Sequence, residues 1–408
     1  MSNALGESVT DASPGASLPA DRDRLPLAGL LALFTAGFLT ILTEALPAGL
    51  LPQMSRGLGV SESLAGQTVT IYAIGTLLTA IPLTVYTASW PRRNVLVLSL
   101  VLFVVANSVT AVSTSFFVTM PARFLAGIAA GIIWSLIGGY AQRLVAPRHS
   151  GRAMAISMAG TPLALALGVP IGTFLGGVVG WQATFGIVTV ATVILIGWVF
   201  WKLPNLSGQA AEKRPPILTV LRLPGLRTVL AVVAGLVIAH NIIYTYIASI
   251  LDGVGMALQT EWVLFAFGAA ALVSIWIVGA LIDRHHRRLV VTSMVVFALG
   301  ALLLGLATLS PVIVYVAAAA WGLAFGGAAT LMITSAARVG GDSADVATSM
   351  VVTMWNVGIA LGGIVGGLLL AGLGSGSLAW VALALMVPTV FIAVAARRYA
   401  FPPSSARL

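Results

Sequence analysis

Residues 94–114 read Asn-Val-Leu-Val-Leu-Ser-Leu-Val-Leu-Phe-Val-Val-Ala-Asn-Ser-Val-Thr-Ala-Val-Ser-Thr and contain no charged side chain. A helix of this length rises about 31 Å, which matches the hydrocarbon core of a bilayer. Arg92 and Arg93 stand directly before the run, so the charges end where the apolar residues begin. The stretch predicts a transmembrane helix.

The whole chain has the same composition. Of its 408 residues 59% are hydrophobic and 8% are charged, whereas a soluble protein carries roughly 25% charged residues. This excludes a soluble enzyme, a disordered protein and a secreted disulfide scaffold. The chain has no cysteine, which also excludes thiolate metal sites and thiol nucleophiles.

Apolar runs long enough to cross a membrane recur along the chain between clusters of charged and turn residues. None shows the alternation of a lipid-embedded β-barrel, so we expect an all-α fold. The runs predict twelve transmembrane helices at 26–52, 63–87, 94–114, 117–144, 152–178, 183–202, 226–251, 260–282, 289–308, 312–337, 345–371 and 378–397.

The basic residues predict the orientation of these helices. If the N-terminus is cytoplasmic, 19 of the 21 Lys and Arg residues fall in cytoplasmic segments; Arg56 lies in an outer loop and Arg123 lies within a helix. Such a bias places both termini in the cytoplasm. It also explains the net charge of +9, so the charge gives no support to nucleic-acid binding. Residues 1–24 are polar and lack the features of a signal peptide, so we expect a disordered cytoplasmic tail.

The helices divide into two sets of six. Residues 203–225 form the longest hydrophilic break and predict a cytoplasmic linker between bundles at 25–202 and 226–398, followed by a tail at 399–408. Features recur at an offset of 195: Gly127 and Gly131 as Gly322 and Gly326, and Arg143 as Arg338. Recurrence at a fixed offset indicates an internal repeat.

Several motifs resemble those of the major facilitator superfamily. Gly279-Ala-Leu-Ile-Asp-Arg-His-His-Arg-Arg288 is similar to its signature loop between the second and third helices of a half, and Arg123-Phe-Leu-Ala-Gly127 to its fourth-helix motif. Gly168-Val-Pro-Ile-Gly-Thr-Phe-Leu-Gly176 resembles the fifth-helix motif of proton antiporters. With Glu44-Ala-Leu-Pro-Ala-Gly-Leu-Leu-Pro52, the chain resembles bacterial arabinose or sugar and purine-nucleoside efflux permeases of the drug:proton antiporter branch.

This resemblance implies residues that gate the transporter. The charged candidates near the cytoplasmic ends of the helices are expected to form a gate; the alternative is a solvated loop that only anchors the orientation of the protein. The glycine and proline candidates of the fifth helix would let helices slide or rock against each other; the alternative is generic close packing. The equivalent N-terminal loop departs from the pattern, because it lacks the acidic residue that Asp283 supplies. The gating candidates are Arg92, Arg93, Asp283, Arg284, Arg287, Arg288, Gly168, Pro170 and Gly172.

Three ionisable residues lie clearly at membrane depth, away from the ends of the predicted spans, and are the candidates for proton coupling: Glu44, Arg123 and His240. Such residues cost at least ~2.5 kcal/mol each to bury in a bilayer, and by default they face a cavity and function. Desolvation favours a neutral carboxyl and a nearby arginine favours the charged one, so a change of surroundings can load and empty Glu44 with a proton. The alternatives are a hydrogen bond at the Pro47 bend for Glu44, a carbonyl-binding latch for Arg123 and a neutral, hydrogen-bonded His240.

Aromatic and amide side chains away from the helix ends are candidates for a substrate cavity, where they would suit sugar rings or flat drug-like molecules. Helix packing is the alternative for each of them. The candidates are Tyr72, Trp134, Tyr244, Tyr246, Trp276, Trp321, Trp355 and Asn356.

Taken together, these patterns predict a secondary transporter, and the resemblance implies a monomer in the bacterial cytoplasmic membrane. It would export a small organic solute in exchange for protons; a proton-independent facilitator or a proton-symporting importer is the alternative. The chain shows no ATP-binding, metalloprotease or serine-hydrolase motif, so we expect no enzyme activity, no metal and no cofactor.

Overall fold

The computed structural model describes residues 25–208 and 217–401, and every regular element in these ranges is a helix. The tail predicted at 1–24, the end of the tail predicted at 399–408 and residues 209–216 of the expected linker lie outside the described residues.

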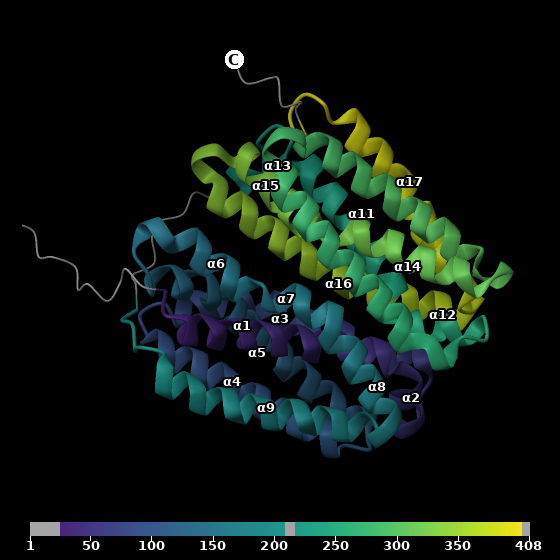
Figure 1. Ribbon diagram of the computed structural model, residues 1–408, viewed down its shortest axis with the longest axis horizontal. Coiled ribbons are helices and arrows are strands. Elements are labelled where there is room, and N and C mark those ends of the chain that lie inside the picture. The colour runs from purple at the N-terminus through teal and green to yellow at the C-terminus, as the bar shows by residue number, and fades with distance from the viewer. Residues whose placement is uncertain (1–24, 209–216, 402–408) are drawn as a thin grey trace, which may run out of the picture.

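The N-terminal half is drawn from purple to teal in Figure 1. Its first helix is divided into α1 (Leu27–Gly49) and α2 (Leu51–Leu58), and its fifth into α6 (Ser150–Met158), α7 (Gly160–Leu163), the π-helix η3 (Ala164–Gly168) and α8 (Val169–Val179). The others are α3 (Glu62–Tyr86), α4 (Arg92–Val112), α5 (Phe116–Arg143) and α9 (Trp181–Lys202).

The C-terminal half lies against the first (Figure 1). After the short α10 (Ile217–Leu221), its first helix is again divided, into α11 (Leu226–Thr245) and α12 (Ile247–Gly253). It continues with α13 (Thr260–Gly305), α14 (Pro311–Phe325), α15 (Ala328–Gly340), α16 (Ala344–Leu373) and α17 (Gly376–Ala395).

Ten helical stretches of the described chain are long and apolar enough to cross a membrane. One of them contains all of α13, which has a kink and comprises two predicted spans, and α3 supplies a further helix of 25 residues. The predicted all-α fold with twelve transmembrane helices is therefore confirmed.

The break predicted between residues 282 and 289 is a tight kink. The two helices of α13 meet at a single non-helical residue, His285, with φ −128° and ψ 22°. The segment contains no proline or glycine, so only this one residue departs from helical geometry. Its charges stand where one predicted span ends and the next begins. The N-terminal half differs because Pro91 stands at the position equivalent to His286 and a turn precedes it.

Glycine contacts recur in the two halves at the predicted offset of 195. A Cβ at Gly127 would meet the carbonyl oxygen of Tyr72, and a Cβ at Gly322 would meet that of Phe267, which is the equivalent residue. The absence of side chains at these glycines lets α5 approach α3, and α14 approach α13, backbone to backbone. The repeat is thus visible in packing as well as in sequence.

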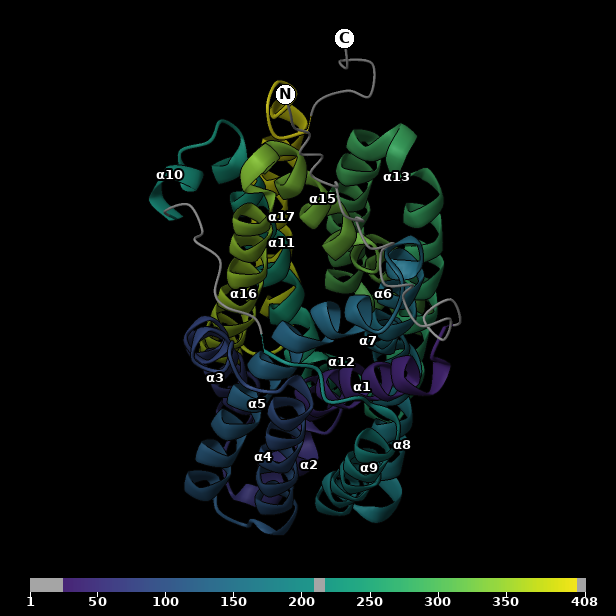
Figure 2. The same ribbon diagram turned by 90° about the vertical axis from the view of Figure 1, so that its left-hand side faces the viewer.

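The two halves contact each other mainly where α3 lies beside α16 and where α13 lies beside η3 and α8 (Figures 1 and 2). Ser63 Oγ donates to Gly367 O at 2.7 Å, and Gln67 Nε2 donates to Gly363 O at 3.1 Å. These bonds join the beginning of α3 to the last turns of α16. We call this the outer end, because the predicted orientation places it away from the cytoplasm.

Candidate functional site

The first helix is bent at Pro47, and this bend organises the site. Proline has no N–H, so the carbonyl of Thr43, four residues earlier, loses its intrahelical donor. Arg123 Nη2 of α5 replaces that donor at 2.8 Å from Thr43 O, and Arg123 Nε lies 3.4 Å from Thr68 O of α3. The arginine therefore ties three helices together through backbone oxygens, as the latch alternative predicted.

The guanidinium of Arg123 is completely buried. Its Cζ lies 5.0 Å from the ring centroid of Tyr72 and 5.6 Å from that of Phe185, distances that allow cation–π attraction. Nη1, however, has no hydrogen-bond partner. A buried charged group with a free donor can respond to a charge that changes beside it.

Glu44 follows Thr43 directly and is half-buried. Its carboxyl interacts electrostatically with Arg123 of its own half and with Tyr244 of the C-terminal half. Of the buried residues that follow in α1, Ala45 and Ala48 belong to the hydrophobic core formed mainly by the C-terminal half, whereas Leu46 belongs to the core of the N-terminal half. Glu44 therefore lies between the halves and does not face lipid.

His240 lies in an aromatic cluster of the C-terminal half. Trp321 Nε1 donates to His240 Nδ1 at 3.0 Å. The imidazole stacks on Phe325, with centroids 3.5 Å apart and planes at 2°, and on Tyr244 at 5.1 Å. In this arrangement His240 is a hydrogen-bonded imidazole, which is the sequence-based alternative to a role in proton coupling.

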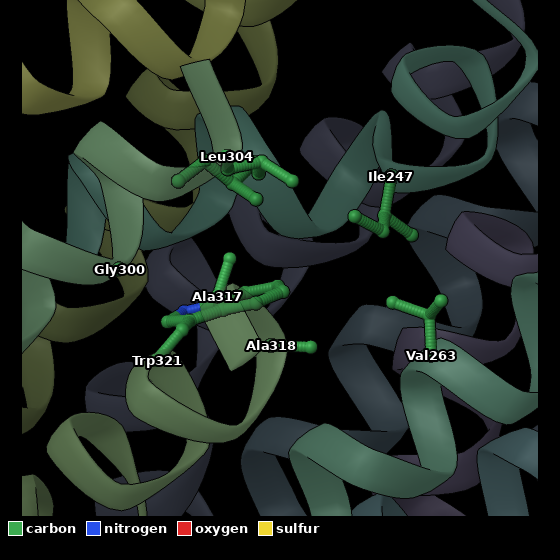
Figure 3. A pocket seen from close by; sticks show the side chains of 8 residues that line it. Ile247, Val263, Gly300, Leu304, Ala317, Ala318 and Trp321 are labelled. Carbon is green, nitrogen blue, oxygen red and sulfur yellow. The ribbon is translucent and has the colours of Figure 1, made fainter. Parts of the chain in front are cut away.

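The repeat position of Arg123 is Ala318, and the small side chain leaves a recess there. Ala318 lines it together with Gly300, Val263 and the indole of Trp321, and the space admits no water molecule (Figure 3). The core around this recess is apolar, so the C-terminal half has no equivalent of the arginine latch.

The other aromatic and amide candidates divide by position. Tyr72 is buried and donates to Thr40 O at 3.2 Å. Trp134 and Trp355 are half-buried; Trp134 lies near Gly37 of α1, and Trp355 contacts Phe325 at 5.5 Å between centroids. Asn356 donates to Val352 O of its own helix at 3.0 Å.

Two aromatic candidates lie away from this cluster. Trp276 is 75% exposed on the outside of α13, so the structure does not bring it to the others. Tyr246, at the break between α11 and α12, bonds Gly363 O and accepts from Gln67 Nε2 at 3.1 Å. It belongs to the contact that closes the outer end.

The charged gating candidates bond within their own halves. Arg92 Nη2 donates to Ala88 O at 2.8 Å, and Arg93 Nη1 lies 3.3 Å from Leu203 O. Arg287 donates to Val394 O at 2.8 Å and to Phe401 O at 3.0 Å.

The remaining charged candidates, Asp283, Arg284 and Arg288, are exposed around the kink at His285. The ends of the halves that carry these charges are therefore anchored to their own helices, whereas the hydrogen bonds that join the halves within the described residues lie at the outer end.

Gly168, Pro170 and Gly172 lie where the fifth helix packs on the first. A Cβ at Gly168 would come 2.8 Å from Phe38 Cζ, and one at Gly172 would come 2.5 Å from Leu46 Cδ1. Pro170 removes an intrahelical donor just after η3, which explains the widened π-helical turn. Glycine positions on α16 pack in the same way on α11, where Gly358 faces Val237.

Sequence reasoning did not identify several polar residues of this region. Asn107 Nδ2 donates to Thr43 Oγ1 at 3.2 Å, and the side chains of Glu62 and Ser249 hydrogen-bond across the outer end. Thr43 could have been found, because it stands four residues before Pro47. In the described part of the chain no three His, Asp or Glu side chains are grouped to hold a metal ion.

Comparison with known proteins decides the family. A family model described as Major Facilitator Superfamily matches residues 33–260 and 257–407. A chloramphenicol efflux pump of Mycobacterium tuberculosis is 33% identical over 359 residues, which cover 83% of this chain and 85% of that protein. The chain belongs to the major facilitator superfamily. It is a membrane transporter of small molecules with efflux pumps among its relatives, and not an enzyme.

A second relative confirms the expected resemblance to purine-nucleoside efflux permeases. The purine ribonucleoside efflux pump NepI of Escherichia coli K12 is 27% identical over 370 residues, which cover 89% of this chain and 93% of the pump.

Two solved structures share the fold. A bacterial homologue of the human lysosomal transporter Spinster, described as inward-facing and unoccupied, has a TM-score of 0.64 at 14% identity and covers 93% of this chain and 97% of its own. The human organic anion transporter MFSD10 has a TM-score of 0.67 at 17% identity, with 91% and 100% covered.

Proposed function

We propose that this transporter exports a small organic solute in exchange for protons, and that Glu44 carries the proton. The observation that carries the proposal is the position of Glu44 between the halves, beside α1 residues that pack into the cores of both, and within electrostatic range of Arg123 and Tyr244. The surroundings of a carboxyl between the halves change whenever the halves move, and the proton affinity of the carboxyl must change with its surroundings.

We propose outward transport from the predicted orientation of the chain in the membrane and from the activity of its relatives. If the basic residues mark the cytoplasm, the bonded outer end makes this an inward-facing state, in which a site between the halves is ready to take solute from the cytoplasm. The relatives named above move chloramphenicol and purine ribonucleosides outward. We propose neutral, ring-bearing solutes of this kind as substrates, in a multi-pass protein of the bacterial cytoplasmic membrane.

Everted membrane vesicles test the proposal. Respiration acidifies their interior, and a pH-sensitive dye reports proton efflux when chloramphenicol or inosine is added outside. We expect the native protein to release protons on addition of at least one of these solutes, and Glu44→Gln to release none. A native protein that moves solute without moving protons would be a facilitator.

The matched control is Asp252→Asn, because Asp252 is an exposed carboxylate at the outer end. This substitution removes the same charge outside the site and should leave proton release as in the native protein. Loss of proton release in both variants would count against a specific role for Glu44.

A further inference from the structure

The hydrogen bond between Trp321 and His240 fixes the position of the imidazole proton. An indole N–H can only donate, so His240 Nδ1, 3.0 Å away, must accept and carries no proton. The imidazole therefore holds its proton on Nε2. If Nδ1 were protonated, its N–H would face the indole N–H and neither could accept, so the indole favours the neutral imidazole.

The same contacts leave only one edge of the ring for a ligand. Phe325 covers a face of the imidazole at 3.5 Å, Tyr244 stacks on it at 5.1 Å, and Trp321 occupies the Nδ1 side. His240 is nevertheless 6% exposed, and Nε2 is not among the polar atoms of the described chain that are buried without a partner. Nε2 diverges from Nδ1 within the ring, so its N–H points away from Trp321.

A second unsatisfied group lies on the same face of α11. Tyr244 follows His240 by four residues, one helical turn later. Its hydroxyl is buried without a hydrogen-bond partner and interacts electrostatically with Glu44. A free donor and an unpartnered hydroxyl thus lie one turn apart, beside the carboxyl between the halves.

We propose that His240 is a fixed hydrogen-bond donor that recognises the transported solute through Nε2–H, and that Trp321 is the positioning residue that locks this tautomer. The proposal rests on the proposed function, because it assigns a substrate role at the same site. The ligand chemistry is a neutral solute with a carbonyl, hydroxyl or ring-nitrogen acceptor that reaches Nε2 while a second polar group satisfies Tyr244. His240 then does not carry the coupled proton.

Nitrogen-15 NMR of the protein labelled at histidine and held in lipid nanodiscs tests the tautomer. The chain has four histidines, and His240→Gln identifies the signals of His240 by their loss. We expect a protonated Nε2 and an unprotonated Nδ1 at neutral pH, and a mixture of tautomers in Trp321→Phe, which keeps an aromatic ring but removes the donor. A protonated Nδ1 in the native protein would overturn the proposal.

Adding chloramphenicol or inosine to the same sample tests recognition. At least one should shift the Nε2 signal, and His240→Leu should weaken its binding about tenfold or more, the loss typical of a removed hydrogen bond. His240→Gln, whose amide can still donate, should bind within a few fold of the native protein. If neither solute shifts the signal, the recognition role is wrong, whereas proton coupling by Glu44 is judged separately in the vesicle assay.

Discussion

Arg123 donates from Nη2 to the carbonyl oxygen of Thr43 at 2.8 Å, and this is the carbonyl that Pro47 deprives of its helical N–H. The bend in α1 and the buried arginine of α5 are thus parts of one arrangement. Because Glu44 is the residue after Thr43, the arrangement also sets where the carboxyl lies relative to the guanidinium.

The arginine and the proline should be energetically coupled. Arg123→Leu removes the donor and should destabilise the protein by about 1–3 kcal/mol, the cost of an unsatisfied buried carbonyl. In the Pro47→Ala background the carbonyl regains a helical N–H, so the same substitution should cost about 1 kcal/mol less. Thermal unfolding of the four purified proteins in detergent measures the cycle. Equal losses in both backgrounds would show that the latch does not serve the bend.

Gly127 should tolerate no side chain. The Cβ of Gly127→Ala would collide with the carbonyl oxygen of Tyr72, and backbone cannot move aside as a side chain can. We expect destabilisation of roughly 1–3 kcal/mol, and the same for Gly322→Ala, which meets the equivalent Phe267. The melting temperature of the purified protein reports both.

Gly139 on the same helix is the control, because nothing lies within 4 Å of a Cβ built there. Gly139→Ala should be neutral or stabilise by up to about 1 kcal/mol through its better helix propensity. If Gly127→Ala and Gly139→Ala melt alike, close backbone approach is not what the glycine provides.

Tyr246 should hold the outer end closed. Tyr246→Phe keeps the ring and removes the hydrogen bond that Tyr246 accepts from Gln67 of the other half, worth about 1 kcal/mol net, so the open population should rise roughly fivefold. The chain has no native cysteine, so spin labels at positions 56 and 258 can report the separation of the two halves at this end directly.

Tyr86→Phe serves as the control for this substitution, because Tyr86 is 68% exposed at the opposite end of α3. Its distance distribution should match that of the native protein. An unchanged distribution in Tyr246→Phe would show that the hydroxyl does not contribute to closure.

The helices and the central carboxyl could be predicted from the sequence for a physical reason. Apolar runs of about 20 residues indicate transmembrane helices, and a single charged residue such as Glu44 within such a run is easily recognised because its burial in the membrane is costly. The charges around residue 285 predicted the break between two spans, but its confinement to the single residue His285 could not be predicted, because charged residues mark a membrane surface without fixing how the chain turns there.

The partners of side chains were beyond sequence reasoning for a different reason. Trp276 and Trp355 both lie within apolar helices, yet one is exposed and the other contacts Phe325, since the rotation of a helix is set by packing against its neighbours. Tyr246 was expected near substrate but accepts a hydrogen bond across the outer end. Its role depends on Gln67, which lies 179 residues away in the chain.

Proteoliposomes that separate exchange from accumulation test the central claim most directly. With equal pH on both sides, labelled chloramphenicol or inosine exchanges with unlabelled solute and requires no net proton movement; with an imposed pH gradient, coupled transport accumulates it. We predict that Glu44→Gln still exchanges solute measurably but does not accumulate it under the gradient. Accumulation by Glu44→Gln at the native level would contradict the assignment of the proton to Glu44.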